Sequence, residues 1–249
     1  MRIQKWSNNN GLLLNAKKCC LMVFGNQSVK YSTPVKIHTS DDHDEACACP
    51  TVTCVTETKY LGVVLDDKMT WKAHVDSLIK KLRPVVACIA KLGRAATRKV
   101  VLQAYHALFE SHIRYGILAY GSAFCSVLAP IERIQNCCVR IMSKSNKRSS
   151  AEPLYDELGV LPLRKLFMSV MLTQLHTRQT HIALNLEKDN AMTYGYATRG
   201  QEAGHIRLPT SRPERTKRLF TRQYLTVYNS LPGYLKSWTQ LKISQRKKK

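Results

Sequence analysis

The chain has 249 residues, of which 44% are hydrophobic, so it is long enough to bury a core and is neither a disordered tail nor a low-complexity scaffold. Its formal net charge is +22. Residues 1–58 hold 6 basic and 5 acidic side chains, whereas residues 59–249 hold 33 basic and 12 acidic side chains. This excess favours a polyanionic partner, and nucleic acid above a membrane, because the sequence contains no apolar run of about 18 residues.

The first third of the sequence predicts a small β layer. Residues 20–24 are typical of a strand, and residues 31–38 of an edge strand, because Pro34 has no backbone N–H to donate. An acidic, small-residue loop over residues 39–54 precedes a third predicted strand over residues 60–65. The layer is therefore expected to be short and to end before the helices begin.

After Thr70 the hydrophobic period becomes helical. Pro84 is expected to kink or divide the first helix, and Thr97 to cap the second. The apolar positions that define these two helices are Val75, Leu78, Ile79, Leu82, Val86 and Ile89, and then Val101, Tyr105, Leu108, His112 and Tyr115.

A third helical stripe precedes a polar, basic linker over residues 143–150. A fourth helical region over residues 153–176 contains a turn between Gly159 and Pro162. Beyond Thr180 the periodicity fades. The third stripe consists of Leu128, Ile131, Ile134, Cys138 and Ile141.

These patterns predict an α+β fold, in which a small antiparallel β layer is followed by an α-helical bundle and a basic, loosely structured C-terminal region. The corresponding segments are residues 1–70, 71–180 and 181–249. The chain has nine cysteines, an odd count, and opens on "MRIQKWSNNNG" without an apolar leader, so reduced thiols and a nuclear or cytoplasmic location are expected.

Asp66 and Asp67 form an adjacent acidic pair at the end of a predicted strand. Two-metal nucleotidyl transfer needs carboxylates that hold two cations about 3.5–4 Å apart, usually from more than one strand. No aromatic-x-Asp-Asp turn occurs in the sequence. The pair is therefore better interpreted as a strand-to-helix turn with an acid near a helix N-terminus.

A second candidate site combines His43 with Cys47, Cys49 and Cys54. Three thiols and an imidazole over twelve residues are a possible zinc set, but structural zinc sites prefer two to four residues between paired cysteines. The spacing favours a variable loop with incidental cysteines, and no metal site is predicted.

Basic residues interleaved with aromatics are the third feature. Arginine and lysine position a phosphate backbone, and aromatic rings stack on bases or sugars, although a solvated helix face explains any one of these residues equally well. The predicted nucleic-acid-binding residues are Lys80, Lys81, Arg114, Arg133, Arg140, Lys144, Lys147, Arg148, Arg215, Lys217, Arg218 and Arg222.

Taken together, several segments resemble the C-terminal part of a reverse transcriptase from a non-LTR (LINE-type) retrotransposon, spanning the end of the palm, the thumb and a C-terminal region. "KYLGVVLDDKMTWKAHV" (59–75) is similar to the family's K-Y-L-G-V-x-x-D-x-x-L-x-W-x-x-H signature. The other segments, in chain order, are "WSNNNGLLLNAKK" (6–18), "YHALFESHIRYGILAYG" (105–121), "LAPIERIQNCCVRIM" (128–142) with Gln135 and Arg140, "AEPLYDELGVLPL" (151–163), "YATR" (196–199) and "VYNSLP" (227–232).

The resemblance implies a role for several residues. Lys17 matches a lysine that aids nucleotide addition in a full polymerase by donating a proton to the leaving pyrophosphate. Tyr60, Leu61 and Gly62 match the strand that steadies the primer end. The helices of residues 71–144 match the thumb, which follows an RNA–DNA hybrid by shape and phosphate. The family's Mg²⁺-binding aspartates would lie before Met1, and Asp66 is the acid of the signature rather than one of them.

The sequence is therefore interpreted as a piece of an RNA-directed DNA polymerase that binds RNA and DNA as template–primer, with Mg²⁺ implied for the full polymerase and no cofactor or catalysis expected from this chain alone. A stand-alone helical scaffold that binds nucleic acid or protein remains the alternative, and a decayed reading frame without a role is the third. The sequence leaves the oligomeric state open.

Overall fold

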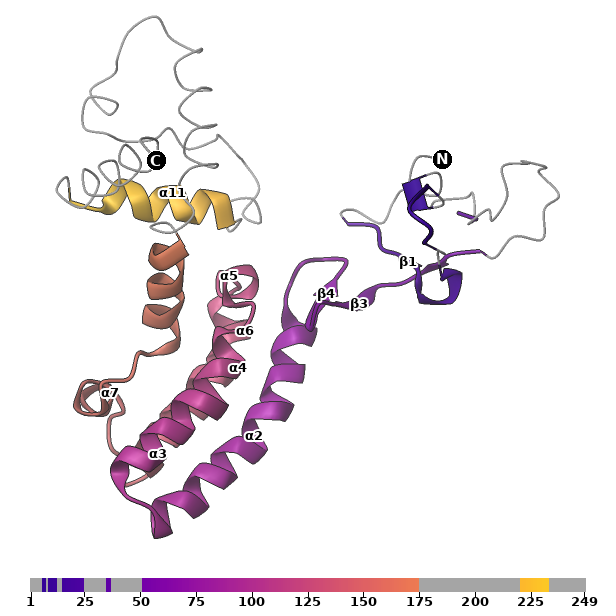
Figure 1. The fold of residues 1–249 in the computed structure, drawn as a ribbon. Coiled ribbons are helices and arrows are strands. Elements are labelled where there is room, and N and C mark those ends of the chain that lie inside the picture. The colour runs from indigo at the N-terminus through magenta and orange to yellow at the C-terminus, as the bar shows by residue number, and fades with distance from the viewer. Residues whose placement is uncertain are drawn as a thin grey trace, which may run out of the picture. The chain divides into compact units, whose positions relative to one another are not determined.

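The structure is a computed structural model, and it describes residues 6–7, 9–12, 15–24, 35–36, 51–174 and 220–232. The chain divides into two compact units, Met1–Ser77 and Leu78–Lys249. Short strands come first in the described residues and helices follow, which confirms the predicted α+β class (Figure 1). None of the helices in these residues is both long and apolar enough to cross a membrane.

Two small sheets occur in the described part of the first unit. β1 (Cys20–Leu21) pairs in parallel with β2 (Thr53–Cys54), and β3 (Glu57–Tyr60) pairs antiparallel with β4 (Val63–Asp66). The antiparallel arrangement predicted for the layer therefore holds for β3–β4 and not for β1–β2. β1 is also shorter than the strand predicted over residues 20–24.

The 3-10 turn η1 (Ala16–Lys18) precedes β1. Of the edge strand predicted over residues 31–38, only Val35 and Lys36 lie within the described residues, and Lys36 forms an isolated bridge with Thr51. The rest of that strand falls outside the part of the chain that the structure describes.

The long helix α2 (Lys72–Ala95) runs unbroken through Pro84. A proline inside a helix removes one backbone hydrogen bond and costs about 3 kcal/mol. Leu82 and Ile89, on either side of it, are completely buried, and their packing offsets that cost. Pro84 therefore does not divide the helix, although division was one of the two outcomes expected from the sequence. Tertiary packing outweighs the local preference of proline.

The second helical stretch has Thr97 at its N-cap position, as predicted, but the threonine side chain makes no capping hydrogen bond. A π-helical turn further along changes the face that the stretch buries. α3 (Arg98–Ala104) continues directly into the π-helix η2 (Tyr105–Glu110) and α4 (Ser111–Arg114). A π turn closes its hydrogen bonds one residue further along than an α-helix does, so buried positions recur at a spacing of four. The buried residues are Val101, Tyr105, Phe109, Ile113 and Ile117.

The predicted stripe of that helix was therefore wrong beyond its first two positions. Leu108 and Tyr115, expected in the core, are exposed, and His112 is half-buried. Phe109 and Ile113 take the core positions instead. Residues spaced by four drift around an α-helix with 3.6 residues per turn, so the α-helical period did not predict this buried set. The sequence contains no signal for the wider π-helical turn.

Further helices complete the described part of the second unit's bundle. α5 (Ile117–Tyr120) leads to α6 (Cys125–Met142), and α7 (Glu152–Leu158) follows the loop over residues 143–150. Residues 163–174 are also helical, which confirms the predicted fourth helical region and its internal turn. α3 and α7 both contact α6, so these elements form one bundle.

The last described helix is α11 (Phe220–Ser230), drawn in yellow in Figure 1. Its buried residues are Tyr224, Leu225 and Tyr228, at a spacing of one and three that gives the helix one apolar face. Burial raises the pKa of Tyr224 to about 12. The helix includes the first four residues of the "VYNSLP" segment (227–232).

Candidate nucleic-acid interface

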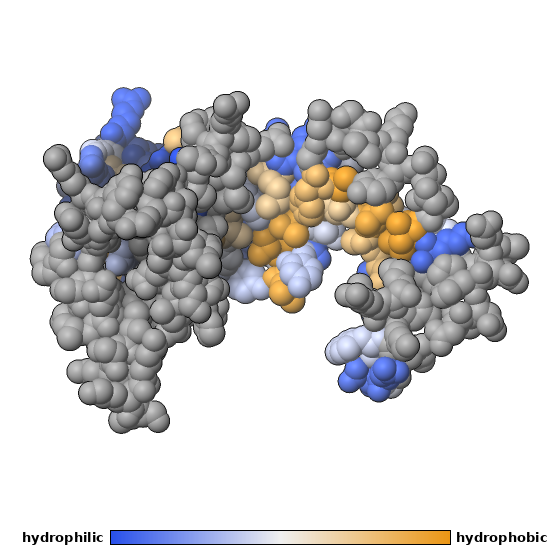
Figure 2. All heavy atoms as spheres, turned by 90° about the horizontal axis from the view of Figure 1, so that it is seen from above, coloured by the Kyte–Doolittle hydropathy of each residue, from blue (hydrophilic) through white to orange (hydrophobic). Residues whose placement is uncertain are grey.

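The β3–β4 hairpin carries an apolar pair at an exposed tip. Tyr60 pairs with Val63, so the loop consists only of Leu61 and Gly62, and both have positive φ angles of 45° and 83°. Two such residues define a type I′ turn, which normally takes Asn-Gly and whose twist suits a hairpin. The Leu61 side chain is 73% exposed and that of Tyr60 is 64% exposed. Figure 2 shows that hydrophobic residues are exposed on one face of the described part of the molecule.

This geometry corrects the prediction of one continuous strand over residues 60–65, because the chain reverses at Leu61 and Gly62. The Leu-Gly pair is not a common hairpin sequence, and the apolar run around it conceals the turn. The three residues predicted to steady a primer end therefore occupy a hairpin tip rather than the middle of a strand.

Asp66 ends β4 and fixes the segment that leads into α2. Its Oδ2 atom accepts hydrogen bonds from the N–H and the hydroxyl of Thr70, at 2.7 and 2.8 Å, and its Oδ1 atom accepts one from the N–H of Trp71 at 2.9 Å. Burial raises the pKa of Asp66, but these hydrogen bonds outweigh burial and hold the pKa below its ordinary value. The carboxylate therefore stabilises the turn before α2, which agrees with the strand-to-helix turn predicted for this acid.

An open hollow of about 620 Å³ lies next to this turn. Lys68 and Lys72 share its lining with the acids, so the hollow is not uniformly acidic. No group of three His, Cys, Asp or Glu side chains in the described residues is placed to hold a metal ion. The residues that line the hollow are Thr56, Glu57, Asp66, Asp67, Lys68, Thr70, Lys72, Ala73 and Asp76.

The Mg²⁺ implied for a full polymerase does not fit this turn. Both carboxylate oxygens of Asp66 already accept hydrogen bonds from Thr70 and Trp71, and a metal would have to displace them. We therefore derive no metal-dependent step from the pair formed by Asp66 and Asp67.

Trp71 and His74 attach the start of α2 to the hairpin. His74 is buried, and its Nδ1 atom accepts a hydrogen bond of 3.4 Å from the N–H of Val64 in β4. Trp71 is buried at a φ of 68°, a conformation that costs an ordinary residue energy. Together with Asp66, these residues are the Asp, Trp and His of the 59–75 segment, and each of them has a folding role.

The solvent-facing side of α2 is basic. Lys80 and Lys81, both predicted to contact nucleic acid, are exposed, and Arg83, Lys91 and Arg94 continue the charge along the helix. The first and last of these are fourteen residues apart, about 21 Å along the helix axis. None of them takes part in a salt bridge with another described residue. The face therefore presents uncompensated positive charge.

Gln135, a landmark of the resemblance, is completely buried and joins three elements. Its Nε2 atom donates to the hydroxyl of Tyr105 and to the carbonyl of Leu161, each at 2.9 Å. Its Oε1 atom accepts from the N–H of Leu163 at 2.9 Å. Because these three bonds satisfy the buried amide, Gln135 fixes the turn around Pro162 to the π-helical segment.

Tyr120 and Gly121, the "Y-G" of another landmark, also have structural roles. The Tyr120 hydroxyl donates to the carbonyl of Ile113, and burial raises the pKa of this tyrosine above its ordinary value. A Cβ atom at Gly121 would lie 2.4 Å from Cδ2 of Phe167 and 2.5 Å from the carbonyl oxygen of Ile117. The glycine is therefore required for the close approach of the helix that carries Phe167.

The other predicted contact residues fall into four groups. Arg114 is exposed but pairs with Glu110 at 2.9 Å, and Arg140 is half-buried with its Nε atom donating to the carbonyl of Ser149 at 2.9 Å. Arg222 is half-buried on α11. The exposed residues are Arg133, Lys144, Lys147 and Arg148, and those outside the described part of the chain are Arg215, Lys217 and Arg218.

Lys17 lies exposed in η1, in the first unit. No contact of this lysine with the described residues tests its role in nucleotide addition, which stays a prediction. Of the cysteines considered for zinc, Cys54 is exposed in β2. His43, Cys47 and Cys49 lie outside the described residues.

Sequence reasoning missed two arginine–carboxylate links within the helical unit. Arg98 pairs with Glu157 at 2.8 Å, and Arg164 pairs with Glu132 at 3.0 Å. The two residues of each pair are far apart in sequence, so no local sequence pattern predicts these ion pairs. A hydrogen bond from Arg164 also lowers the pKa of the exposed Cys125 thiol.

The chain has a distant, partial similarity to a non-LTR retrotransposon reverse transcriptase. It is 27% identical over 156 residues to the RNA-directed DNA polymerase from mobile element jockey of Drosophila melanogaster. The match covers 61% of this chain, less than the nearly complete span that the motifs suggested, and 15% of the length of that protein. No family model and no solved structure matches the chain.

Proposed function

We propose that the chain is part of an RNA-directed DNA polymerase of a non-LTR retrotransposon and that it binds the template–primer duplex. The observation that carries this proposal is the unit formed by the hairpin and the start of α2. In it the buried Asp66, Trp71 and His74 of the 59–75 segment support the hairpin, and two of its apolar members, Tyr60 and Leu61, are exposed at the tip. The similarity to the jockey polymerase supports the same conclusion.

In this proposal the two kinds of exposed residue have different tasks. The hairpin tip contacts the sugar and base at the primer end, where Gly62 allows close backbone approach. The basic face of α2, with Lys80 and Lys81, contacts the phosphates of the RNA–DNA hybrid and so reads shape rather than sequence. Lys17 would serve nucleotide addition only within a complete polymerase, and the chain by itself extends no primer.

Fluorescence anisotropy of the purified full chain tests the binding. The probes are a fluorescein-labelled RNA–DNA hybrid with a recessed primer end and a blunt hybrid of the same length. We expect affinity that is independent of sequence and falls steeply with salt, with a slope of about −0.9 per phosphate contact. Affinity that does not change with ionic strength would refute the proposal. Primer extension by the chain alone with Mg²⁺ would refute its inactivity.

A matched pair of variants tests the tip. Leu61→Asn keeps the turn, because Asn tolerates positive φ, but removes the apolar tip. Met69→Asn makes the same exchange at a φ of 51° on a side chain that is 43% exposed and lies outside the tip. We expect the unaltered chain to bind the recessed hybrid more tightly than the blunt one. Leu61→Asn should abolish this preference, and Met69→Asn should preserve it. An equal effect of both variants would contradict the assignment of the tip.

The second candidate, a helical scaffold without a polymerase role, is favoured by the structural tasks of Asp66, Trp71, His74 and Gln135. A scaffold needs those residues but not the exposed tip. Binding that is indifferent to the hairpin variants and to the primer end would therefore support this candidate.

A further inference from the structure

The loop over residues 143–150, interpreted from sequence as a linker, has a fixed internal structure. At its start the N–H of Lys144 donates to the carbonyl of Ile141 at 3.2 Å, and the N–H of Ser145 donates to the carbonyl of Arg140 at 3.0 Å. This pair of bonds is a Schellman motif, which ends α6. The arginine side chain then donates to the carbonyl of Ser149 at 2.9 Å and closes the loop.

Lys144 occupies the position of this motif that glycine usually takes. Its φ is 52°, in the left-handed region, where a residue with a Cβ atom is strained. The backbone alone would therefore be better served by glycine. A lysine at this point places its cation at the C-terminal end of α6, beside the remaining charges of the loop.

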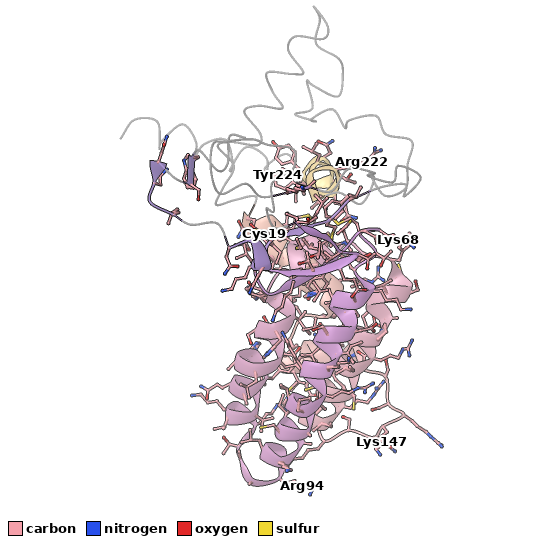
Figure 3. All side chains as sticks on the ribbon, turned by 90° about the vertical axis from the view of Figure 1, so that its right-hand side faces the viewer. Cys19, Lys68, Arg94, Lys147, Arg222 and Tyr224 are labelled. Atoms are coloured by element: carbon pink, nitrogen blue, oxygen red, sulfur yellow. The ribbon has the colours of Figure 1, made fainter. Side chains whose placement is uncertain are left out.

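Those charges, on Lys144, Lys147 and Arg148, are exposed, and no acid among the described residues forms a salt bridge with them. By contrast, Arg98, Arg114 and Arg164 of the same helical unit each pair with a glutamate. Lys147, labelled in Figure 3, extends away from the helices.

The turn between α2 and α3 adds further cations at the same end of the bundle. Lys91, Arg94 and Lys99 are exposed there, and Figure 3 shows Arg94 at the end of the helix bundle. The ion pair between Arg98 and Glu157 ties the start of α3 to α7, the helix that directly follows the loop. The two basic segments therefore adjoin helices that both pack on α6.

We propose that these six residues, named here the basic end (Lys91, Arg94, Lys99, Lys144, Lys147 and Arg148), bind the phosphate backbone of double-stranded nucleic acid. Neither segment, 91–99 or 143–150, contains an aromatic residue. Surfaces that bind single strands combine basic residues with aromatic rings on which bases stack, so the basic end suits a duplex instead. The proposal rests on the proposed function and extends the phosphate contact of α2, to which Lys91 and Arg94 belong, to the loop over residues 143–150.

A charge-matched pair of double variants tests the basic end. Lys147→Gln with Arg148→Gln removes two charges from the loop, and Lys68→Gln with Lys72→Gln removes two from the lining of the hollow in the first unit. Anisotropy with a blunt RNA–DNA hybrid should show about tenfold weaker binding and a salt slope reduced by about two for the loop variant only. Lys144→Gly should weaken binding while the melting temperature stays constant or rises, since glycine relieves the left-handed backbone.

The outcomes distinguish failure of the proposed function from failure of the basic end. If the unaltered chain binds no hybrid, the proposed function and the basic end fall together. If it binds and both double variants behave alike, the basic end alone is overturned. A larger loss on single-stranded RNA, or on vesicles containing phosphatidylserine, than on the hybrid would also overturn it.

Acetylation footprinting of the unaltered chain provides a test that needs no variant. The hybrid should protect Lys91, Lys99, Lys144 and Lys147 from the reagent and leave Lys68 reactive. Protection of Lys68 with continued reactivity of the loop lysines would refute the assignment.

Discussion

Gly121→Ala is expected to destabilise the helical unit strongly. The added Cβ atom would lie 2.4 and 2.9 Å from Cδ2 and Cγ of the buried Phe167 ring, and 2.5 Å from the backbone carbonyl oxygen of Ile117. Overpacking of this kind costs typically 1–3 kcal/mol, and the upper part of that range applies because a backbone atom cannot rotate out of the way. For a chain of this size, about 3 kcal/mol lowers the melting temperature by roughly 6–12 °C.

Gly93→Ala is the matched control. Gly93 lies inside α2, has no heavy atom within 4 Å of the position of a new Cβ, and does not have a positive φ. Alanine favours a helix over glycine by up to about 1 kcal/mol, so this variant should be more stable than the parent chain. Urea denaturation followed by circular dichroism measures both. Equal shifts of the two midpoints in the same direction would refute the packing argument.

A double-mutant cycle isolates the contact. Phe167→Leu should cost stability by itself, but in the Gly121→Ala background it should cost less, because the smaller side chain makes room for the new methyl group. Additive losses would show that the clash with the ring is not the cause.

Three further predictions concern polar groups. Asp66→Asn loses the two hydrogen bonds accepted by Oδ2 and should cost about 2 kcal/mol at neutral pH. Because the folded-state pKa of Asp66 is lowered, this stabilisation is complete above the unfolded-state pKa of about 4 and is lost as the pH falls through the folded-state pKa. The urea midpoints of the parent chain and the variant should therefore converge in acid. A difference between the midpoints that does not depend on pH would contradict the role of Asp66 in the turn. Gln135→Leu leaves a hydroxyl and two backbone groups without their partner and should cost about 2–4 kcal/mol in the same assay, whereas a loss below about 1 kcal/mol would show that water replaces the amide. Iodoacetamide should modify Cys125 first, because Arg164 lowers the pKa of its thiol, and Cys138 only on unfolding, because burial raises its pKa to about 12; mass spectrometry that finds Cys138 modified first would refute this order.

The landmarks that suggested a reverse transcriptase are, for the most part, residues that the fold needs. Asp66 holds Thr70 and Trp71, Gln135 holds the turn at Pro162, and Gly121 admits the Phe167 ring. Their spacing was visible in the sequence, but the bonds that explain it were not. The partners of Gln135 are 26 to 30 residues away, beyond the reach of any local pattern.

The sequence by itself determined the class of the fold, the order of short strands before the long helices, the N-cap position of Thr97 and the place of Asp66 in the turn before α2. Each of these depends on composition or on neighbours within one helical turn. The side chain of Thr97 nevertheless makes no capping hydrogen bond. The tertiary structure alone decided the turn at Leu61 and Gly62, the continuity of α2 through Pro84, the π-helical shift that buries Phe109 in place of Leu108, and the shape of the loop closed by Arg140. At Pro84 and in the π-helical segment, local preference and long-range packing disagree. Burial of the surrounding side chains contributes more free energy than a single backbone hydrogen bond or a strained dihedral costs, so packing prevails.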